Sequence, residues 1–192
     1  MPVNDNLVEQ SKNIFKNYIA INVSTNNYLL TDLFDIKYGK GLSSSDLLNS
    51  GYFVFGSNGL IGYYNSYMYE NEQITISCRG ASSGKVNISL PKSYITSNSL
   101  ILECKNQQYY EFLKQFCKNY NFEEYVTGSA QPQLTIDSLV NISVLLPKLE
   151  ETTDICSILS ILSNKITENK LEILNLENNK DLILNCILKN YN

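Results

Sequence analysis

The chain has 192 residues, of which 43% are hydrophobic and 18% charged, and its formal net charge is −4. This apolar fraction is too high for a disordered chain. The absence of histidine excludes a Ser-His-Asp or Cys-His catalytic site and any metal site built on histidine. Most nucleic-acid-binding proteins have a basic excess, so the acidic balance argues against DNA unless the basic residues are gathered locally.

The five cysteines are scattered and form no CxxC pair or other close cluster. They are Cys78, Cys104, Cys117, Cys156 and Cys186. An odd count at such positions indicates reduced thiols that are buried as small apolar residues, rather than a disulfide framework or a zinc site. No signal peptide is visible, and no stretch approaches the roughly 18 apolar residues that span a bilayer. We therefore expect a soluble, cytoplasmic protein without membrane contact.

Residues 1–27 predict a short helical segment. Within it, residues 7–20 place apolar side chains at spacings of three and four, which is typical of an amphipathic helix, and the polar stretch NVSTNN ends the pattern.

Residues 28–149 predict a mixed, β-rich domain of normal size. Short runs rich in Val, Ile, Tyr and Phe, such as YFVFG, QITISC, KVNISL, SLILEC and NISVLLP, are strand-like and are separated by glycine-containing turns. Residues 107–120 interrupt them with a helical pattern that has one apolar face. The fold class that we expect is α+β.

Residues 150–192 predict one long coiled-coil helix. Residues 150–190 contain no glycine or proline, and two acids at their start suit the positive end of the helix dipole. Alternate steps of four and three residues give a seam in which eight of ten positions are apolar. Apart from Lys180, the seam consists of Ile155, Leu159, Leu162, Ile166, Asn169, Ile173, Leu176, Ile183 and Ile187.

Two interpretations of this seam are open. The helix can fold back on its own domain, or it can form an intermolecular coiled coil. The span 155–187 would be about 50 Å long at a rise of 1.5 Å per residue. A domain of this size cannot cover that length, so we favour the intermolecular coiled coil, in which Asn169 would select one register.

The sequence contains no constellation suited to catalysis. The acid pairs Glu123-Glu124 and Glu150-Glu151 are adjacent in sequence, so their side chains point apart and are typical of solvated charges. The stretches GSNGLIG and GASSGK lack the spacing or the terminal Ser/Thr of a phosphate-binding loop. We predict no catalytic residue, no metal site and no cofactor on this chain.

A polar loop between two strands is a better candidate for binding. The segment ITISCRGASSGKVNI carries Arg79, the only arginine of the chain, and Lys85. Glycine-flanked backbone N–H groups suit anions, and arginine can contact a phosphate or the guanine edge with two hydrogen bonds. The plainer alternative is a hairpin loop with a structural arginine.

Two other loops carry suitable side chains. TGSAQPQLT presents glutamines, which suit bidentate contact with adenine, although a turn before a strand also explains it. IKYGKGLSSSD presents lysines and serines that suit phosphates. The candidate DNA-binding residues are Lys37, Lys40, Ser57, Asn58, Arg79, Ser82, Ser83, Lys85, Ser129, Gln131 and Gln133.

In their order along the chain, these motifs resemble a known family. GSNGLIGYYNSY, ITISCRGASSGKV, GSAQPQLT and ISVLLPKLEETTDI, followed by a long helix, are similar to one repeat of the DNA-sequence specificity (S) subunit of type I restriction–modification systems. The resemblance covers about residues 7 to 190. The chain departs from the family in two ways. The junction after Pro147 lacks the usual glutamine, and a full subunit has two recognition domains and two long helices.

The resemblance implies a non-catalytic subunit that recognises double-stranded DNA through a target recognition domain. Its partners would be methyltransferase (M) subunits, which would carry the S-adenosylmethionine, and a restriction (R) subunit can also belong to such a complex. A half-length chain implies pairing with another half-subunit or with a copy of itself. An antiparallel homodimer would recognise a bipartite inverted repeat.

Two alternatives stay open. A non-DNA coiled-coil adaptor would use its β-rich head and its tyrosines to bind a protein or a glycan, and a truncated remnant would have no function. Charge does not exclude DNA, because residues 31–146 hold ten acids and eight bases and are only slightly acidic. We expect weak DNA binding by the chain alone and tighter binding in a complex with methyltransferase subunits.

Overall fold

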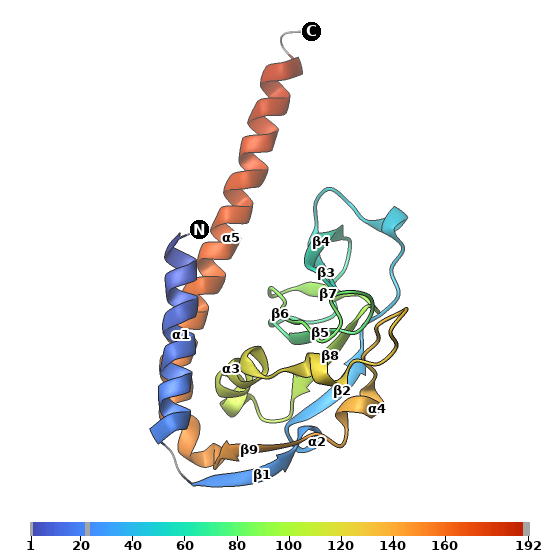
Figure 1. Cartoon of the computed structure of the whole chain (residues 1–192). Coiled ribbons are helices and arrows are strands. Elements are labelled where there is room, and N and C mark those ends of the chain that lie inside the picture. The colour runs from blue at the N-terminus through green and yellow to red at the C-terminus, as the bar shows by residue number, and fades with distance from the viewer. Residues whose placement is uncertain (1, 22–23, 190–192) are drawn as a thin grey trace.

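A computed structural model describes residues 2–21 and 24–189. Two antiparallel helices, α1 (Pro2–Ile21) and α5 (Thr153–Lys189), lie along one side of a mixed domain (Figure 1). The Tyr18 hydroxyl donates a hydrogen bond of 2.6 Å to the Glu151 carbonyl, and the Asn169 amide donates one of 2.9 Å to Asn4. Because α1 reaches only to about Asn169, the distal part of α5 extends beyond it (Figure 1). The predicted helix at 7–20 is confirmed and is longer than expected.

The chain enters and leaves the domain through one pair of strands. β1 (Thr25–Leu29) pairs antiparallel with β9 (Ser143–Pro147), from Thr25 opposite Pro147 to Leu29 opposite Ser143. β9 agrees with the predicted strand NISVLLP. β1 was not predicted, because its sequence TNNYL is polar and mostly exposed.

The centre of the domain is a four-stranded antiparallel sheet in the order β2-β8-β5-β6. Its strands are β2 (Phe34–Tyr38), β8 (Ser99–Cys104), β5 (Ile74–Ser77) and β6 (Val86–Ile88). Every residue of β5 is buried, as its run of β-branched side chains indicates. β5 and β6 form the predicted hairpin around Arg79.

A smaller sheet in the order β4-β3-β7 lies beside the first. Its strands are β3 (Tyr52–Gly56), β4 (Gly59–Tyr64) and β7 (Ser93–Ile95), and β7 runs parallel to β3. The remaining helices are α2 (Leu30–Leu33), α3 (Tyr110–Asn119) and α4 (Ile136–Leu139). Single 3-10 turns cover Ser44–Asp46, Gln107–Tyr109, Phe122–Tyr125 and Leu149–Thr152.

The main hydrophobic core joins the helices to the domain. Phe15 of α1 and Phe112 of α3 pack with their ring centres 5.2 Å apart, and Ile155 and Leu159 of α5 belong to the same buried cluster. A second cluster under the small sheet contacts Leu171 and Leu174 of α5, among others. The domain is therefore held to α5 over several helical turns.

This packing corrects part of the predicted intermolecular seam. Ile155 and Leu159 are buried in the chain's own core and are not available to a second copy. The half-buried seam residues are Leu162, Ile166, Asn169 and Ile173. Leu176 and Ile183 are exposed, and Ile187 lies outside the side chains that the structure describes.

The cysteines agree with the sequence in the described part of the chain. Cys78, Cys104, Cys117 and Cys156 are buried and form no disulfide, whereas Cys186 lies outside the described side chains. Burial raises the pKa of the Cys104 thiol to about 11, so it stays protonated at neutral pH. Among the described residues, no helix is both apolar enough and long enough to cross a lipid bilayer.

Candidate nucleic-acid interface

Two of the predicted binding loops are hydrogen-bonded to each other. The loop after β5 and the loop before α4 meet where Arg79 and Gln133 form an isolated antiparallel β-bridge. The Gly80 amide and the Ser83 hydroxyl each donate a 3.0 Å hydrogen bond to the Pro132 carbonyl. Segments about 50 residues apart in sequence therefore form one surface, and the loop before α4 projects on the side away from α5 (Figure 1).

A partly buried polar network fixes the β3–β4 turn to the same surface. The Ser57 carbonyl accepts a hydrogen bond of 3.1 Å from the Asn87 amide and another from the Ser77 hydroxyl. The Ser57 hydroxyl in turn donates to the Asn98 carbonyl at 3.0 Å, and the Cys78 amide donates to that carbonyl at 2.9 Å. The turn that carries Asn58 is thus tied to the strand that leads into Arg79.

The loop that contains Lys40 lies next to the segment between β7 and β8. The Lys40 amide donates to the Ile95 carbonyl at 3.0 Å, and the Lys40 carbonyl accepts from the Ser97 amide at 3.0 Å. Lys40 itself is exposed. The loop with Lys40 and the segment between β7 and β8 are more than 50 residues apart in sequence, so the sequence alone did not indicate that they are in contact.

Two hollows open between these loops, and Arg79, Gly80 and Ala81 line both. The first has a volume of about 540 Å³ and is also lined by the β3–β4 turn, Thr96 and Asn98. The second has a volume of about 570 Å³ and is also lined by residues 130–133. Arg79 is exposed, and within the described residues its guanidinium group forms no ion pair. An exposed, unpaired charged group that lines two hollows suits contact with an anion or a base edge.

The predicted residues differ in what their side chains do. Exposed on this surface are Lys40, Asn58, Arg79, Lys85, Ser129, Gln131 and Gln133. Ser57 and Ser82 are half-buried, and Ser83 is buried with its hydroxyl on Pro132. Lys37 lies on β2 with its ammonium group 2.6 Å from Glu103, and the hydrogen bond to that carboxylate raises the pKa of Lys37. Ser83 and Lys37 therefore have structural partners already.

The unpaired basic side chains of the domain gather here. Within the described part of residues 28–149, the bases without an ion pair are Lys40, Arg79, Lys85 and Lys118. The first three belong to the loops of this surface. The overall charge of −4 therefore conceals a local group of uncompensated cations.

Sequence reasoning missed three residues that line the first hollow: Ile61, Thr96 and Asn98. Asn98 is exposed in the turn between β7 and β8, where SNS resembles any polar turn. Thr96 is buried, and its hydroxyl has no hydrogen-bond partner in the described residues. The pattern of the sequence carried no signal for either.

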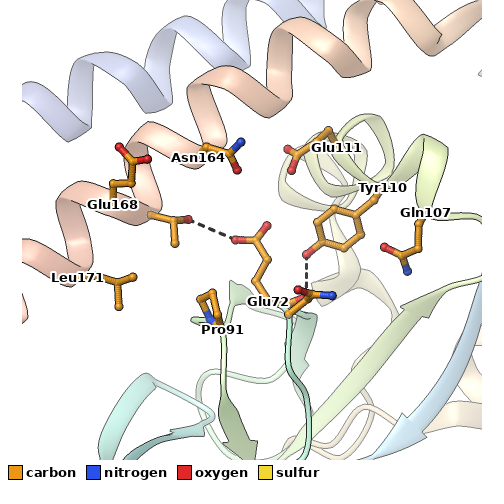
Figure 2. A pocket seen from close by; sticks show the side chains of 10 residues that line it. Glu72, Pro91, Gln107, Tyr110, Glu111, Asn164, Glu168 and Leu171 are labelled. Carbon is orange, nitrogen blue, oxygen red and sulfur yellow. Dashed lines mark hydrogen bonds between the residues drawn. The ribbon is translucent and has the colours of Figure 1, made fainter.

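A separate hollow of about 400 Å³ lies at the joint between the domain and α5 (Figure 2). Glu72, Tyr110 and Glu111 face Thr167 and Glu168 of α5 across it. The Thr167 hydroxyl donates to Glu72 at 3.4 Å, and the Tyr110 hydroxyl donates to the Glu72 carbonyl at 3.3 Å. This acidic joint is distinct from the cationic loops.

A family model for the type I restriction modification DNA specificity domain matches residues 9–178. The chain belongs to this family. A putative type I specificity subunit of Mycoplasma pneumoniae is 32% identical over 176 residues, which are 85% of this chain and 56% of that protein. The EcoprrI type I restriction enzyme specificity subunit of Escherichia coli is 24% identical over 147 residues, which are 72% of this chain and 37% of that protein.

Solved structures from type I restriction–modification systems have the same fold. The S subunit of a type I restriction–modification system from M. genitalium superposes with a TM-score of 0.63 at 17% identity, over 83% of this chain and 44% of that one. A chain from a study of complex assembly and conformational transition of the type I R-M system gives 0.54 at 16% identity, over 94% and 52%. This type I specificity domain spans about half the length of the relatives it matches. The predicted family and the α+β fold with its long helix are confirmed.

Proposed function

We propose that this chain recognises one half-site of a bipartite double-stranded DNA target and positions methyltransferase subunits on it. The observation that carries the proposal is the gathering of unpaired cations and exposed amides on one loop surface, with Arg79 between two hollows. Arginine and lysine supply phosphate contacts, and Asn, Gln and Arg match base edges in the major groove. Membership of the specificity family supports the same assignment.

In this proposal the catalytic chemistry belongs to partner subunits. Methyltransferase subunits would bind S-adenosylmethionine and transfer the methyl group, and a restriction subunit would join the complex where cleavage occurs. This chain would bind no cofactor and would act in the cytoplasm with those partners.

Two copies of the chain would pair through the distal part of α5. Leu176 and Ile183 are about 60% exposed and lie seven residues apart, hence on one helix face. Helix α1 covers α5 only to about Asn169, so an antiparallel second α5 can lie against the distal part without displacing α1. Such a two-fold pair would hold one recognition domain at each end and would recognise an inverted repeat across a spacer.

The DNA half of the proposal is tested by replacing the free cations. In a complex with the methyltransferase subunit, Arg79→Ala should lower affinity for the target about 5- to 150-fold, as loss of one bidentate contact does. Lys85→Ala should lower the affinity for all DNA sequences by the same factor and reduce the salt dependence of binding. Lys92→Ala, which removes an exposed lysine paired with Glu70, is the matched control. Unchanged methylation by the Arg79→Ala, Lys85→Ala double variant would support the adaptor alternative.

The pairing is tested by the mass of the chain in solution. We expect light scattering to give twice the mass of one chain for the wild type and the mass of one chain for Leu176→Glu with Ile183→Glu. Ile161→Glu is the control, since this residue is 70% exposed but lies between Glu151 and Asn169, in the part of the chain that runs alongside α1. A monomeric wild type at micromolar concentration would refute the homodimer and leave pairing with another half-subunit.

A further inference from the structure

The hollow between the β3–β4 turn and Arg79 is lined by polar groups that the fold leaves unused. The Asn98 side-chain amide has no hydrogen bond within the described residues, although the Asn98 backbone is firmly held. The Cys78 amide and the Ser57 hydroxyl both donate to the Asn98 carbonyl, at 2.9 and 3.0 Å. A fixed backbone that carries a free amide is suited to recognition, because little order has to be gained on binding.

The other lining groups complement this amide. Ile61 is 46% exposed and lines the same hollow. Because exposure of an aliphatic side chain to water is unfavourable, contact with an apolar group of a ligand would stabilise the complex. Thr96 is 6% exposed, and its hydroxyl lacks a partner in the described part of the chain. Gly56 has no side chain, and a Cβ built there would lie 3.2 Å from the Cδ1 atom of Ile61, so the glycine leaves room for the Ile61 side chain.

An A·T pair is the base pair that this set of groups matches. Adenine offers a donor and an acceptor on its major-groove edge, which an asparagine amide contacts with two hydrogen bonds. The thymine of the same pair offers a methyl group, which suits an aliphatic side chain. A G·C pair offers no methyl group and would leave Ile61 without a contact.

We propose that Asn98 and Ile61 determine specificity for one A·T base pair within the half-site, with Asn98 on the adenine edge and Ile61 against the thymine methyl. This inference rests on the proposed function, because it assigns residues of the same surface to one base pair. Arg79, at the border of the hollow, contacts a neighbouring phosphate or guanine.

The test uses the chain in complex with its methyltransferase subunit and a plasmid library with randomised target positions, read by sequencing of methylated sites. Asn98→Ala should reduce discrimination at one A·T position by about tenfold or more and leave the other positions unchanged. Asn98→Asp should shift that position toward cytosine, because a carboxylate accepts from the cytosine amino group. Asn65→Ala, an exposed asparagine at the opposite end of β4, should change nothing.

A second variant separates binding from folding. Thr96→Val removes a hydroxyl that has no partner in the described residues, so the thermal stability of the free chain should stay equal or rise. Because this hydroxyl is buried, the same variant should leave discrimination at the position that Asn98 determines unchanged, so it serves as the control for disturbance of the hollow.

The outcomes are distinguishable. A wild-type complex with no sequence preference would overturn the proposed function and this inference with it. The inference alone would be overturned by a wild-type complex that is sequence-specific but whose half-site lacks an A·T pair. An Asn98→Ala variant that methylates every target sequence less, by the same factor, would also overturn it. Retained discrimination in Asn98→Ala, or an equal loss in Asn98→Ala and Thr96→Val, would do the same.

Discussion

The ammonium group of Lys114 lies 2.6 Å from a carboxylate oxygen of Glu72, and this buried ion pair joins the domain to the long helix. Lys114 on α3 is only 5% exposed, and it also contacts Glu111 at 2.7 Å and the Ser163 hydroxyl of α5. The Lys114 ammonium group thus joins α3 to α5 and to the segment that carries Glu72. Glu72 and Glu111 also line the acidic hollow (Figure 2). The contact fixes how the domain sits on the helix.

Lys114→Met should destabilise the chain by about 3 kcal/mol, because it leaves two largely buried carboxylates without a cation. Urea unfolding at neutral pH measures this loss. Lys165→Met removes a lysine from an exposed pair with Glu168 and should cost less than about 1 kcal/mol. Equal losses for the two variants would show that the buried pair contributes no more than a surface pair.

The Lys114→Met variant should also become more stable as the pH falls. Burial raises the pKa of Glu111 above its usual value even though Lys114 lowers it, so removal of Lys114 raises this pKa further. The folded state then binds more protons than the unfolded state, and stability decreases as pH rises from about 4.5 toward the folded pKa. Unfolding at pH 5 and pH 7 tests the sign, and adding Glu111→Gln should reduce this dependence, with Glu72 left as the second carboxylate without a cation.

Glu103 should behave in the opposite way. Burial alone would raise its pKa, but hydrogen bonds from Lys37 and Tyr69 outweigh burial and hold the pKa below its usual value. Its contribution to stability is therefore present above the unfolded pKa of about 4.3 and is lost as pH falls through the folded value. Glu103→Gln should lower stability at pH 7 but flatten the loss between pH 4.5 and 3. A slope identical to the wild type would contradict this account.

Gly84→Ala should be strongly destabilising. Gly84 has φ +89°, and a Cβ there would lie 2.8 Å from the backbone of Glu123, next to the fully buried Phe122. We expect a loss of about 3 kcal/mol, since the clash adds to the cost of a left-handed backbone. Gly80 has φ +76°, but a Cβ built there has no neighbour within 4 Å, so Gly80→Ala should lower the free energy of unfolding by only about 1 kcal/mol. The difference in melting temperature between the two variants isolates the clash.

Asn87→Ala should loosen the β3–β4 turn more than it destabilises the fold. It removes the 3.1 Å hydrogen bond to the Ser57 carbonyl, a net loss of about 1 kcal/mol. Amide hydrogen exchange of residues 57–60 should accelerate, and methylation should become less selective in the complex. Faster exchange without any change in selectivity would mean that the position of the turn does not affect recognition.

The sequence was informative wherever local composition decides structure. β3, β5 and β8 follow from their β-branched and aromatic runs, and α3 from its apolar face. β1, β2, β4 and β7 were missed. β1 is polar, β7 is three residues long and pairs in parallel with a distant strand, the end of β2 lies in a stretch interpreted as a loop, and β4 contains two glycines. Their stability comes from pairing that no local pattern contains.

The candidate site was predictable only in pieces. Arg79 and Gln133 stood out in separate loops, but their contact joins positions 54 residues apart and depends on the whole fold. Lys37 looked like a phosphate ligand because its partner, Glu103, is 66 residues away in sequence. The long helix illustrates the same limit, since the periodic seam could not indicate that Ile155 and Leu159 pack within the chain.

The exposed amide side chains that line the hollows do not hold the loops. Asn58, Asn98 and Gln131 are exposed, whereas the loops are fixed by backbone groups, by the Ser57 hydroxyl and by the partly buried Ser77–Asn87 network. Exchanging an exposed amide should therefore cost the fold almost nothing. A domain with the function proposed above can therefore acquire a new target by single substitutions, without first accumulating spare stability.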